Sequence, residues 1–131
     1  RRVMRLGDGD SVALFNGRDG EWRAEVAGDG RRGLPEIAAP VRFDAFLDSC
    51  GHLFWADEQG GSDAFDTFDA AGPGPATLLI GPEGGFADEE RAALGPAATA
   101  VSLGPRILRA DTAAVSLLTL WQAAAGDWEA D

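Results

Sequence analysis

The stretch that most constrains the fold is LLIGPEGGF, residues 78–86, in which a short apolar run passes directly into a turn of three glycines and a proline. An apolar run of this length that ends at Gly and Pro is typical of a strand buried inside a sheet. Helix-forming sequence follows from Ala87, because the three acidic residues at 88–90 suit the positive end of a helix dipole. A buried strand, a turn and a helix in succession indicate an α/β sheet with crossover connections.

The same alternation of strands and helices continues over most of the chain beyond residue 40. The apolar positions of 42–48 fall at helical spacing, and 113–126 has the pattern of a strongly apolar helix closed by Gly126. The expected fold class is therefore α/β. The other predicted elements are a buried strand over 52–58, a helix fragment or loop over 60–75, strands over 76–80 and 98–104, a helix over 87–94 and a loop over 105–112.

The first thirty residues have a different pattern, which indicates β-hairpins. Two apolar runs cover 12–15 and 22–26, and the Asn-Gly and Asp-Gly pairs between them suit tight hairpin turns. Two or three strands are too few to be stable alone. This β-module ends at residues 27–40, where Gly, Asp, Arg and Pro predict a loop or linker.

The charge of the chain argues against a strong nucleic-acid surface over most of its length. The formal net charge is −11, and the chain has no lysine. Affinity for phosphate rests on Lys and Arg, so an acidic chain is a poor nucleic-acid binder. Residues 1–32, however, hold seven arginines against six acidic residues, whereas residues 33–131 hold four against sixteen. Any RNA contact is therefore expected to start at the N-terminal end or to come from something outside this sequence.

The cysteine count and the apolar runs bear on where the chain is found. A single cysteine, Cys50, excludes an internal disulfide framework and fits a reducing compartment, so we expect a cytoplasmic protein. No apolar run approaches the roughly 18–20 residues that a membrane span needs. The first residues lack a hydrophobic signal core and Met4 is not at the start, so we expect the natural N-terminus to be missing.

Three loops that follow predicted strands are candidates for one binding site: residues 56–60, 81–85 and 103–109. Ligands of open α/β sheets bind beyond the carboxyl ends of the strands. Glycine backbone and aliphatic side chains suit a flat, largely uncharged ring. The three loops have neither the Lys and Ser or Thr of a phosphate loop nor a G-x-G-x-x-G fingerprint, and no Cys/His spacing suggests a metal site. An adenosine-bearing cofactor without phosphates is the better chemical match.

LLIGPEGGF followed by SLGPRILRADTA resembles the SPOUT methyltransferases, and in particular the family of ribosomal RNA small subunit methyltransferase E. The N-terminal residues 2–26 resemble the PUA-like β-barrel of the same family. The resemblance implies a partial PUA-like RNA-binding domain over 1–30 and a trefoil-knotted methyltransferase domain over 31–131. It also implies S-adenosylmethionine-dependent methylation of N3 of uridine 1498 in 16S rRNA, with the small ribosomal subunit as partner and a homodimer packed through the knot.

The same resemblance implies which residues bind the cofactor. Close approach of backbone to ligand or knot would then account for Gly81, Gly84 and Gly85. Arg109 and Asp111 are the candidate catalytic residues; the general base stays open among Asp111, Glu83 and Asp57. The expected cofactor cradle consists of Leu79, Ile80, Gly81, Gly85, Leu103, Gly104, Ile107, Leu108, Arg109 and Ala113.

Two departures from the family pattern keep other functions open. The chain reads Arg109-Ala110-Asp111-Thr112 where the family commonly reads Arg-x-Glu-Thr. The family also has a long basic stretch near residues 30–31, holding the rest of the barrel and the first strand and helices of the second domain, which we expect this sequence to omit. The alternatives are another SPOUT methyltransferase, such as one acting on a ribose 2′-hydroxyl, and a non-catalytic RNA-binding or ribosome-assembly module. Two of the candidate residues also have simpler, structural explanations. Arg109 could form an ion pair with Asp111, and Glu83 could cap a helix.

Overall fold

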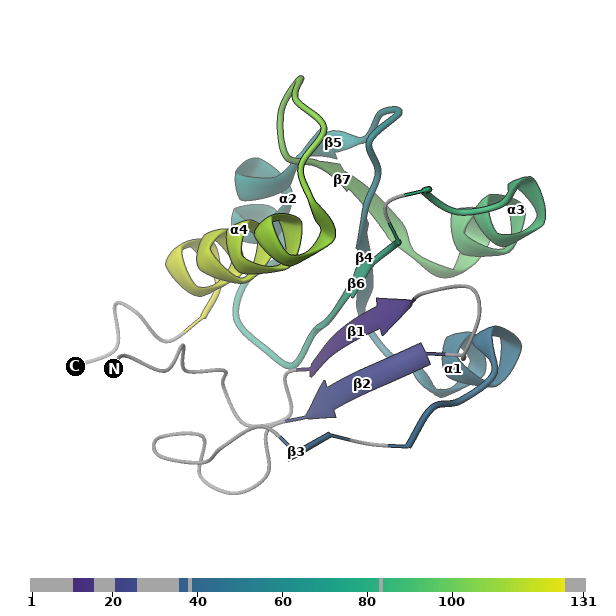
Figure 1. The fold of residues 1–131 in the computed structure, drawn as a ribbon. Helices are drawn as coiled ribbons and strands as arrows, with labels where there is room; N and C mark the ends of the chain where they lie inside the picture. The colour runs from purple at the N-terminus through teal and green to yellow at the C-terminus, as the bar shows by residue number, and fades with distance from the viewer. Residues whose placement is uncertain (1–10, 16–20, 26–35, 38, 83, 127–131) are drawn as a thin grey trace.

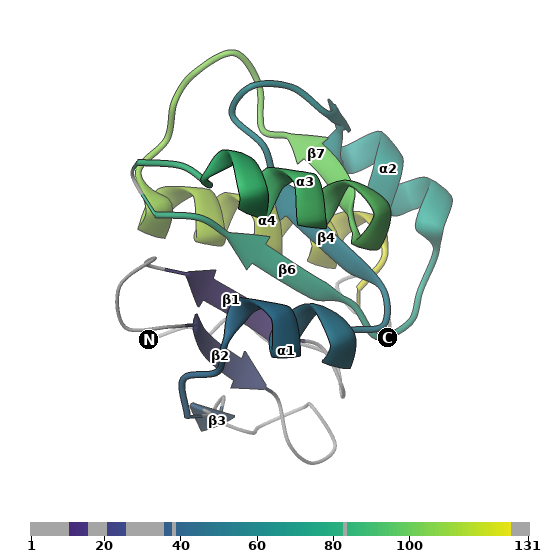
Figure 2. The ribbon, with the colours of Figure 1, turned by 90° about the vertical axis from the view of Figure 1, so that its right-hand side faces the viewer.

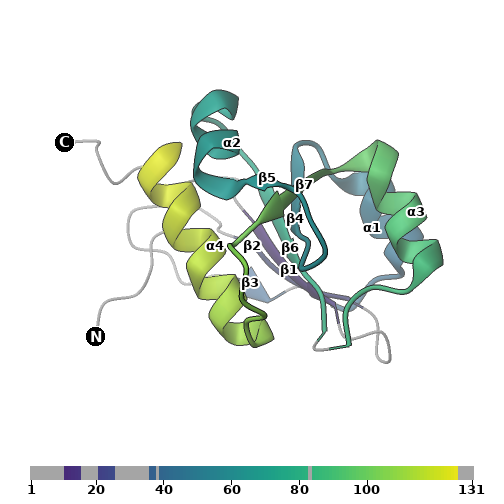
Figure 3. The ribbon, with the colours of Figure 1, turned by 90° about the horizontal axis from the view of Figure 1, so that it is seen from above.

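The computed structural model describes residues 11–15, 21–25, 36–37, 39–82 and 84–126. A central sheet lies between two layers of helices, with α2 and α4 on one face and α1 and α3 on the other (Figures 1 and 3). The elements are β1 (Ser11–Phe15), β2 (Glu21–Glu25), β3 (Glu36–Ile37), α1 (Phe43–Ser49), β4 (Leu53–Ala56), β5 (Ser62–Asp63), α2 (Ala64–Ala71), β6 (Thr77–Ile80), α3 (Asp88–Ala97), β7 (Thr99–Ser102) and α4 (Ala110–Ala124).

The sheet has seven strands in the order β3-β2-β1-β6-β4-β7-β5. The strands β6, β4, β7 and β5 are parallel to one another, as the α/β pattern predicts. The predicted hairpin is present as the antiparallel pair of β1 and β2, and β1 also pairs in parallel with β6 (Figure 2). The N-terminal strands therefore extend the same sheet, which provides the partners that two or three strands need. The division of the chain at residue 30 stays a prediction.

The strand β6 is buried on both faces, and its side chains alternate between two hydrophobic cores. Leu78 and Ile80 pack on the side of α2 and α4, whereas Leu79 packs on the side of α1 and α3. This period of two follows from the pleat of a strand. Burial on both faces explains why the sequence of β6 is a continuous apolar run.

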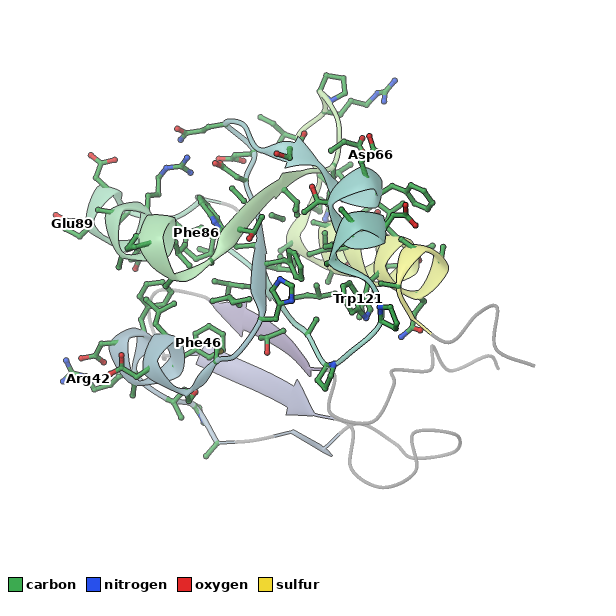
Figure 4. All side chains as sticks on the ribbon, turned by 180° about the vertical axis from the view of Figure 1, so that it is seen from behind. Arg42, Phe46, Asp66, Phe86, Glu89 and Trp121 are labelled. Carbon is green, nitrogen blue, oxygen red and sulfur yellow. The ribbon has the colours of Figure 1, made fainter. Side chains whose placement is uncertain are left out.

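Aromatic side chains fill both cores. In Figure 4, Trp121 of α4 lies on one side of the sheet and Phe46 of α1 lies on the other. Trp121 makes an edge contact with Phe68 of α2, at a ring separation of 5.2 Å. Large buried rings thus hold α1, α2 and α4 against the sheet and supply much of the apolar area that folding removes from water. The buried side chain of α3 is Leu94.

The predicted helix over 42–48 and the predicted strands over 52–58, 76–80 and 98–104 are confirmed as α1, β4, β6 and β7. The range 60–75 contains a helix, α2, whose first turn is capped by the Asp63 carboxylate accepting a 3.0 Å hydrogen bond from the Asp66 amide. The short strands β3 and β5 were not predicted, and β3 lies within 27–40, where a loop or linker was expected. The helix predicted over 87–94 extends to Ala97.

The start of α4 corrects the sequence prediction of a loop over 105–112. The helix begins at Ala110, and the Ala113 amide donates a 2.8 Å hydrogen bond to the Arg109 carbonyl. Ala favours a helix and an acidic residue suits its first turn, so the helix continues back through Asp111. Its C-cap is Ala125, one residue before the predicted Gly126. In the part of the chain that the structure describes, no helix is long and apolar enough to cross a membrane.

Candidate functional site

A cavity lies at the carboxyl ends of the neighbouring strands β4, β6 and β7, where their three loops meet. Its empty volume is about 670 Å³, including open solvent at its mouth. Each of the three loops contributes lining residues, which confirms the prediction that they line one pocket. The lining residues are Trp55, Ala56, Asp57, Glu58, Ile80, Gly81, Pro82, Gly85, Phe86, Arg91, Leu103, Gly104, Arg106, Leu108, Ala110 and Ala113.

Most of the predicted cofactor residues line this cavity. They are Ile80, Gly81, Gly85, Leu103, Gly104, Leu108 and Ala113.

Three of the predicted cofactor residues lie elsewhere. Leu79 is fully buried in the core on the side of α1 and α3. Ile107 is 79% exposed. Arg109 is exposed at the N-terminus of α4 and is not among the lining residues. Contacts of these three residues with a cofactor stay predictions.

At two of the three glycines in the loop 81–85, the structure requires glycine. A Cβ built on Gly81 would lie 2.8 Å from Cε2 of Phe86, so any larger residue must displace that ring. Gly85 has φ of +74° and a Cβ there would approach Oε1 of Glu58 to 3.0 Å. A Cβ on Gly84 would meet nothing within 4 Å, so close approach does not explain that glycine among the described residues.

An ion pair between Arg91 of α3 and Asp57 at the end of β4 forms one wall of the cavity. Two hydrogen bonds of 2.9 Å join the guanidinium to both carboxylate oxygens. The side chain of Arg91 is 24% exposed and that of Asp57 is 8% exposed. The Arg91 Cζ also lies 5.1 Å from the ring centroid of Trp55. The hydrogen bonds to Asp57 raise the pKa of Arg91 above its ordinary value, so this wall keeps its cation.

The Asp57 carboxylate is committed to this wall. Besides the two bonds from Arg91, its Oδ1 accepts a 2.9 Å hydrogen bond from the Gln59 amide. The Asp57 amide donates to the Val101 carbonyl at 3.0 Å, which fixes the loop to β7. A general base needs a carboxylate oxygen within hydrogen-bond reach of substrate. These contacts favour a positioning role for Asp57 rather than proton transfer.

The two candidate catalytic residues lie together at the N-terminus of α4. Arg109 Nε is 3.8 Å from Asp111 Oδ1, and both side chains are largely exposed, at 83% and 78%. They follow Leu108 and flank Ala110, both of which line the cavity. Both candidates are therefore close in sequence to the cavity wall and accessible to a large substrate.

Glu83, the remaining candidate base, lies outside the described residues. The capping role of Glu83 stays a prediction. At the N-terminus of α3, the Glu90 Oε2 accepts a 2.8 Å hydrogen bond from the Ala87 amide.

Sequence reasoning missed Arg91, Phe86 and Trp55 as parts of the site. Arg91 reaches Asp57 across 34 positions of sequence, and no local pattern reveals such a pair. Phe86 makes an edge contact with Trp55 at a ring separation of 5.5 Å, which closes the wall beneath Arg91. One available signal was that Arg91 is one of only four arginines beyond residue 32.

Comparison with known proteins gives two family matches. Residues 30–122 match the family of RNA methyltransferase domains, and residues 1–34 match the PUA domain of RNA methyltransferases.

Similar curated proteins are named ribosomal RNA small subunit methyltransferase E, from Mycobacterium bovis and Mycobacterium tuberculosis. Each is 50% identical over 68 residues, which cover 46% of this chain and 26% of the relative. The chain thus matches about a quarter of the length of these relatives.

Two solved structures have a similar fold. A Legionella pneumophila protein, proposed to be a methyltransferase and solved with bound SAM, is 37% identical with a TM-score of 0.63 over 73% of this chain and 40% of its own. A hypothetical protein is 26% identical with a TM-score of 0.56, over 66% of this chain and 51% of its own.

Proposed function

The chain belongs to the RNA methyltransferase family, and from that membership we propose that it methylates N3 of a uridine in 16S rRNA with S-adenosylmethionine as cofactor. The uridine is the one numbered 1498, by resemblance to the small subunit methyltransferase E family. The observation that carries the proposal is the cavity at the ends of β4, β6 and β7, built from the GPEGGF and LGPRILRA loops. The Legionella protein, similar over most of this chain, holds SAM.

The residues of the cavity fit this cofactor. Glycine backbone at Gly81 and Gly104, with the aliphatic side chains of Ile80, Leu103 and Leu108, suits a flat adenine ring. Space beside Gly81 is already limited by Phe86, so a side chain at 81 would fill the cradle. When bound, S-adenosylmethionine supplies an electrophilic methyl group on a positively charged sulfur.

The chain's own residues then have distinct tasks. Apolar walls exclude water and hold the reactants in line, which is the larger contribution to such a displacement. The Arg91–Asp57 pair keeps one wall in place. Arg109 is proposed to hold an RNA phosphate or to stabilise the negative charge that develops on uracil as N3 loses its proton. Asp111, exposed beside it, is proposed to receive that proton from an RNA substrate.

The wider organisation of the protein is part of the same proposal. We propose a partial PUA-like domain over 1–30 and a trefoil-knotted methyltransferase domain over 31–131, in a cytoplasmic homodimer that acts on the small ribosomal subunit. The match of residues 1–34 to a PUA domain supports an RNA-binding N-terminal end. Val115, an apolar residue of α4 that is 55% exposed in the single chain, supports a dimer contact there.

Calorimetric titration with S-adenosylmethionine tests the cofactor step, with Gly81→Val and Gly84→Val as a matched pair. Saturable binding by the natural chain that Gly81→Val abolishes and Gly84→Val keeps would support the site, because a side chain at position 81 meets Phe86 whereas a Cβ at position 84 meets nothing within 4 Å. Absence of binding by a folded sample would refute the cofactor assignment for this chain.

Methylation of 16S rRNA and of small subunits, followed by mass spectrometry of nucleosides, tests the substrate. A methyl group on uracil N3 supports the proposed reaction. A methyl group on a ribose 2′-oxygen would instead identify another RNA methyltransferase. Cofactor binding without transfer to any RNA would favour the non-catalytic module, which the acidic balance of residues 33–131 keeps in view.

A further inference from the structure

Four charged side chains line the cavity, and only two of them are paired with each other. Asp57 and Arg91 neutralise one another across 2.9 Å. Glu58 and Arg106 also line the cavity, and in the part of the chain that the structure describes neither side chain has an ion pair or hydrogen bond. The cavity therefore offers a ligand one unpaired carboxylate and one unpaired guanidinium.

The two unpaired groups come from neighbouring strand ends. Glu58 follows β4 and Arg106 follows β7, and these strands pair in parallel with Ala56 opposite Val101. Because parallel strands end at the same edge of a sheet, both loops open on the same mouth. The Glu58 carboxylate also lies against the loop 81–85, since its Oε1 would be 3.0 Å from a Cβ on Gly85. It faces the glycine backbone that the cofactor is proposed to contact.

We propose that Glu58 and Arg106 bind the amino-acid end of the cofactor, with the carboxylate accepting from its ammonium group and the guanidinium donating to its carboxylate. This inference rests on the proposed function and names the residues that recognise one end of the cofactor. That end is a zwitterion, so opposite unpaired charges at one mouth match it. An arginine fork donates to a carboxylate in two parallel bonds, which adds geometric selectivity.

Asp57 cannot take the place of Glu58, although the two are adjacent in sequence. Its oxygens already accept from Arg91 and from the Gln59 amide. Those bonds, with the Asp57 amide bonded to Val101, fix the turn that carries Glu58. Asp57 is thus a positioning residue for Glu58.

Three related ligands separate recognition of the amino-acid end from other effects. S-adenosylmethionine carries the zwitterion and a charged sulfur, S-adenosylhomocysteine carries the zwitterion alone, and 5′-methylthioadenosine carries neither. We expect Glu58→Gln and Arg106→Gln to weaken binding of the first two ligands by about tenfold or more, as loss of a hydrogen bond to a charged group predicts. Affinity for 5′-methylthioadenosine should be unchanged.

The matched controls are Glu89→Gln and Arg42→Gln, which remove exposed charges outside the cavity, on α3 and at the start of α1 (Figure 4). They should leave all three affinities unchanged. Equal weakening of all three ligands by Glu58→Gln, weakening for S-adenosylmethionine alone, or no weakening would each overturn the inference. Failure of the proposed function appears differently: the natural chain itself would bind none of the three ligands.

Discussion

Arg91 and Asp57 lie 34 positions apart in the chain, yet the Arg91 guanidinium donates to both oxygens of the Asp57 carboxylate at 2.9 Å. The pair joins α3, the helix that follows the loop 81–85, to the end of β4, one of the strands whose loops line the cavity. Trp55 lies beneath the guanidinium, which shields one side of it from water. The position of one cavity wall thus depends on two side chains from different crossover units.

Replacing Arg91 with Gln should lower the free energy of unfolding by about 1–3 kcal/mol, because it leaves a nearly buried carboxylate without its charged partner. Thermal or denaturant unfolding measures the loss. The control is Arg42→Gln, which breaks an ion pair with Asp44 whose side chains are 86% and 69% exposed. That change should cost under about 1 kcal/mol, as exposed pairs do. Equal losses for the two variants would show that the Arg91 pair is no better than a surface contact.

The contribution of Arg91 to stability should not change between about pH 7 and pH 9. Its hydrogen bonds to Asp57 raise the folded-state pKa above the ordinary value. A raised pKa gives stability that is fully present below the unfolded-state value and is lost only as pH rises through the folded-state value, far above this window. Unfolding of the natural chain and of Arg91→Gln at both pH values tests this. A difference between them that shrinks at the higher pH would contradict it.

Leu117 of α4 should be a major contributor to stability, because it is fully buried in the core beneath α4. Leu117→Ala should cost about 2–5 kcal/mol, from lost burial and the cavity left behind. On the same helix, Val115 is 55% exposed in the single chain, so Val115→Ala should change the stability of the monomer by less than about 0.5 kcal/mol. Denaturant unfolding compares the two at protein concentrations low enough to give a monomer. A large loss for Val115→Ala under those conditions would mean that α4 packs differently, whereas a loss that appears only at high protein concentration would fit the proposed dimer contact.

Arg109→Ala should reduce RNA methylation by at least about 10²-fold, the typical cost of losing a group that stabilises developing charge. The fold should be unaffected, since the side chain is 83% exposed and its contact with Asp111 is 3.8 Å long. Single-turnover methylation and thermal unfolding measure the two effects separately. Undiminished turnover would remove Arg109 from the mechanism.

The sequence predicts the second half of the sheet well for a physical reason. A strand buried on both faces must be continuously apolar, and Gly or Pro must end it where the chain turns, as in β6. The start of α4 was not predicted because its N-cap is Arg109, whose side chain makes no capping hydrogen bond. The two-residue strand β5 is too short to show any period.

The candidate site divides in the same way. The three loops could be placed together because parallel strands end at one edge of the sheet. The wall built by Arg91 and Phe86 could not, because contacts between distant segments leave no local pattern. The sequence of a hairpin does not reveal which strand pairs with its free edge. The parallel pairing of β1 with β6 was therefore not predicted.

The pairing of β1 with β6 also sets an order of events during synthesis. The register places Ser11 beside Thr77, so the hairpin of β1 and β2 is made long before its neighbour leaves the ribosome. Until then β1 presents unpaired backbone groups along one edge, a template for pairing with other chains. Closing so long a loop is also slow compared with pairing β4, β6 and β7 among themselves. The exposed edge of β1 is therefore covered only when β6, the strand that leads into the glycine turn, has been made and has paired with it.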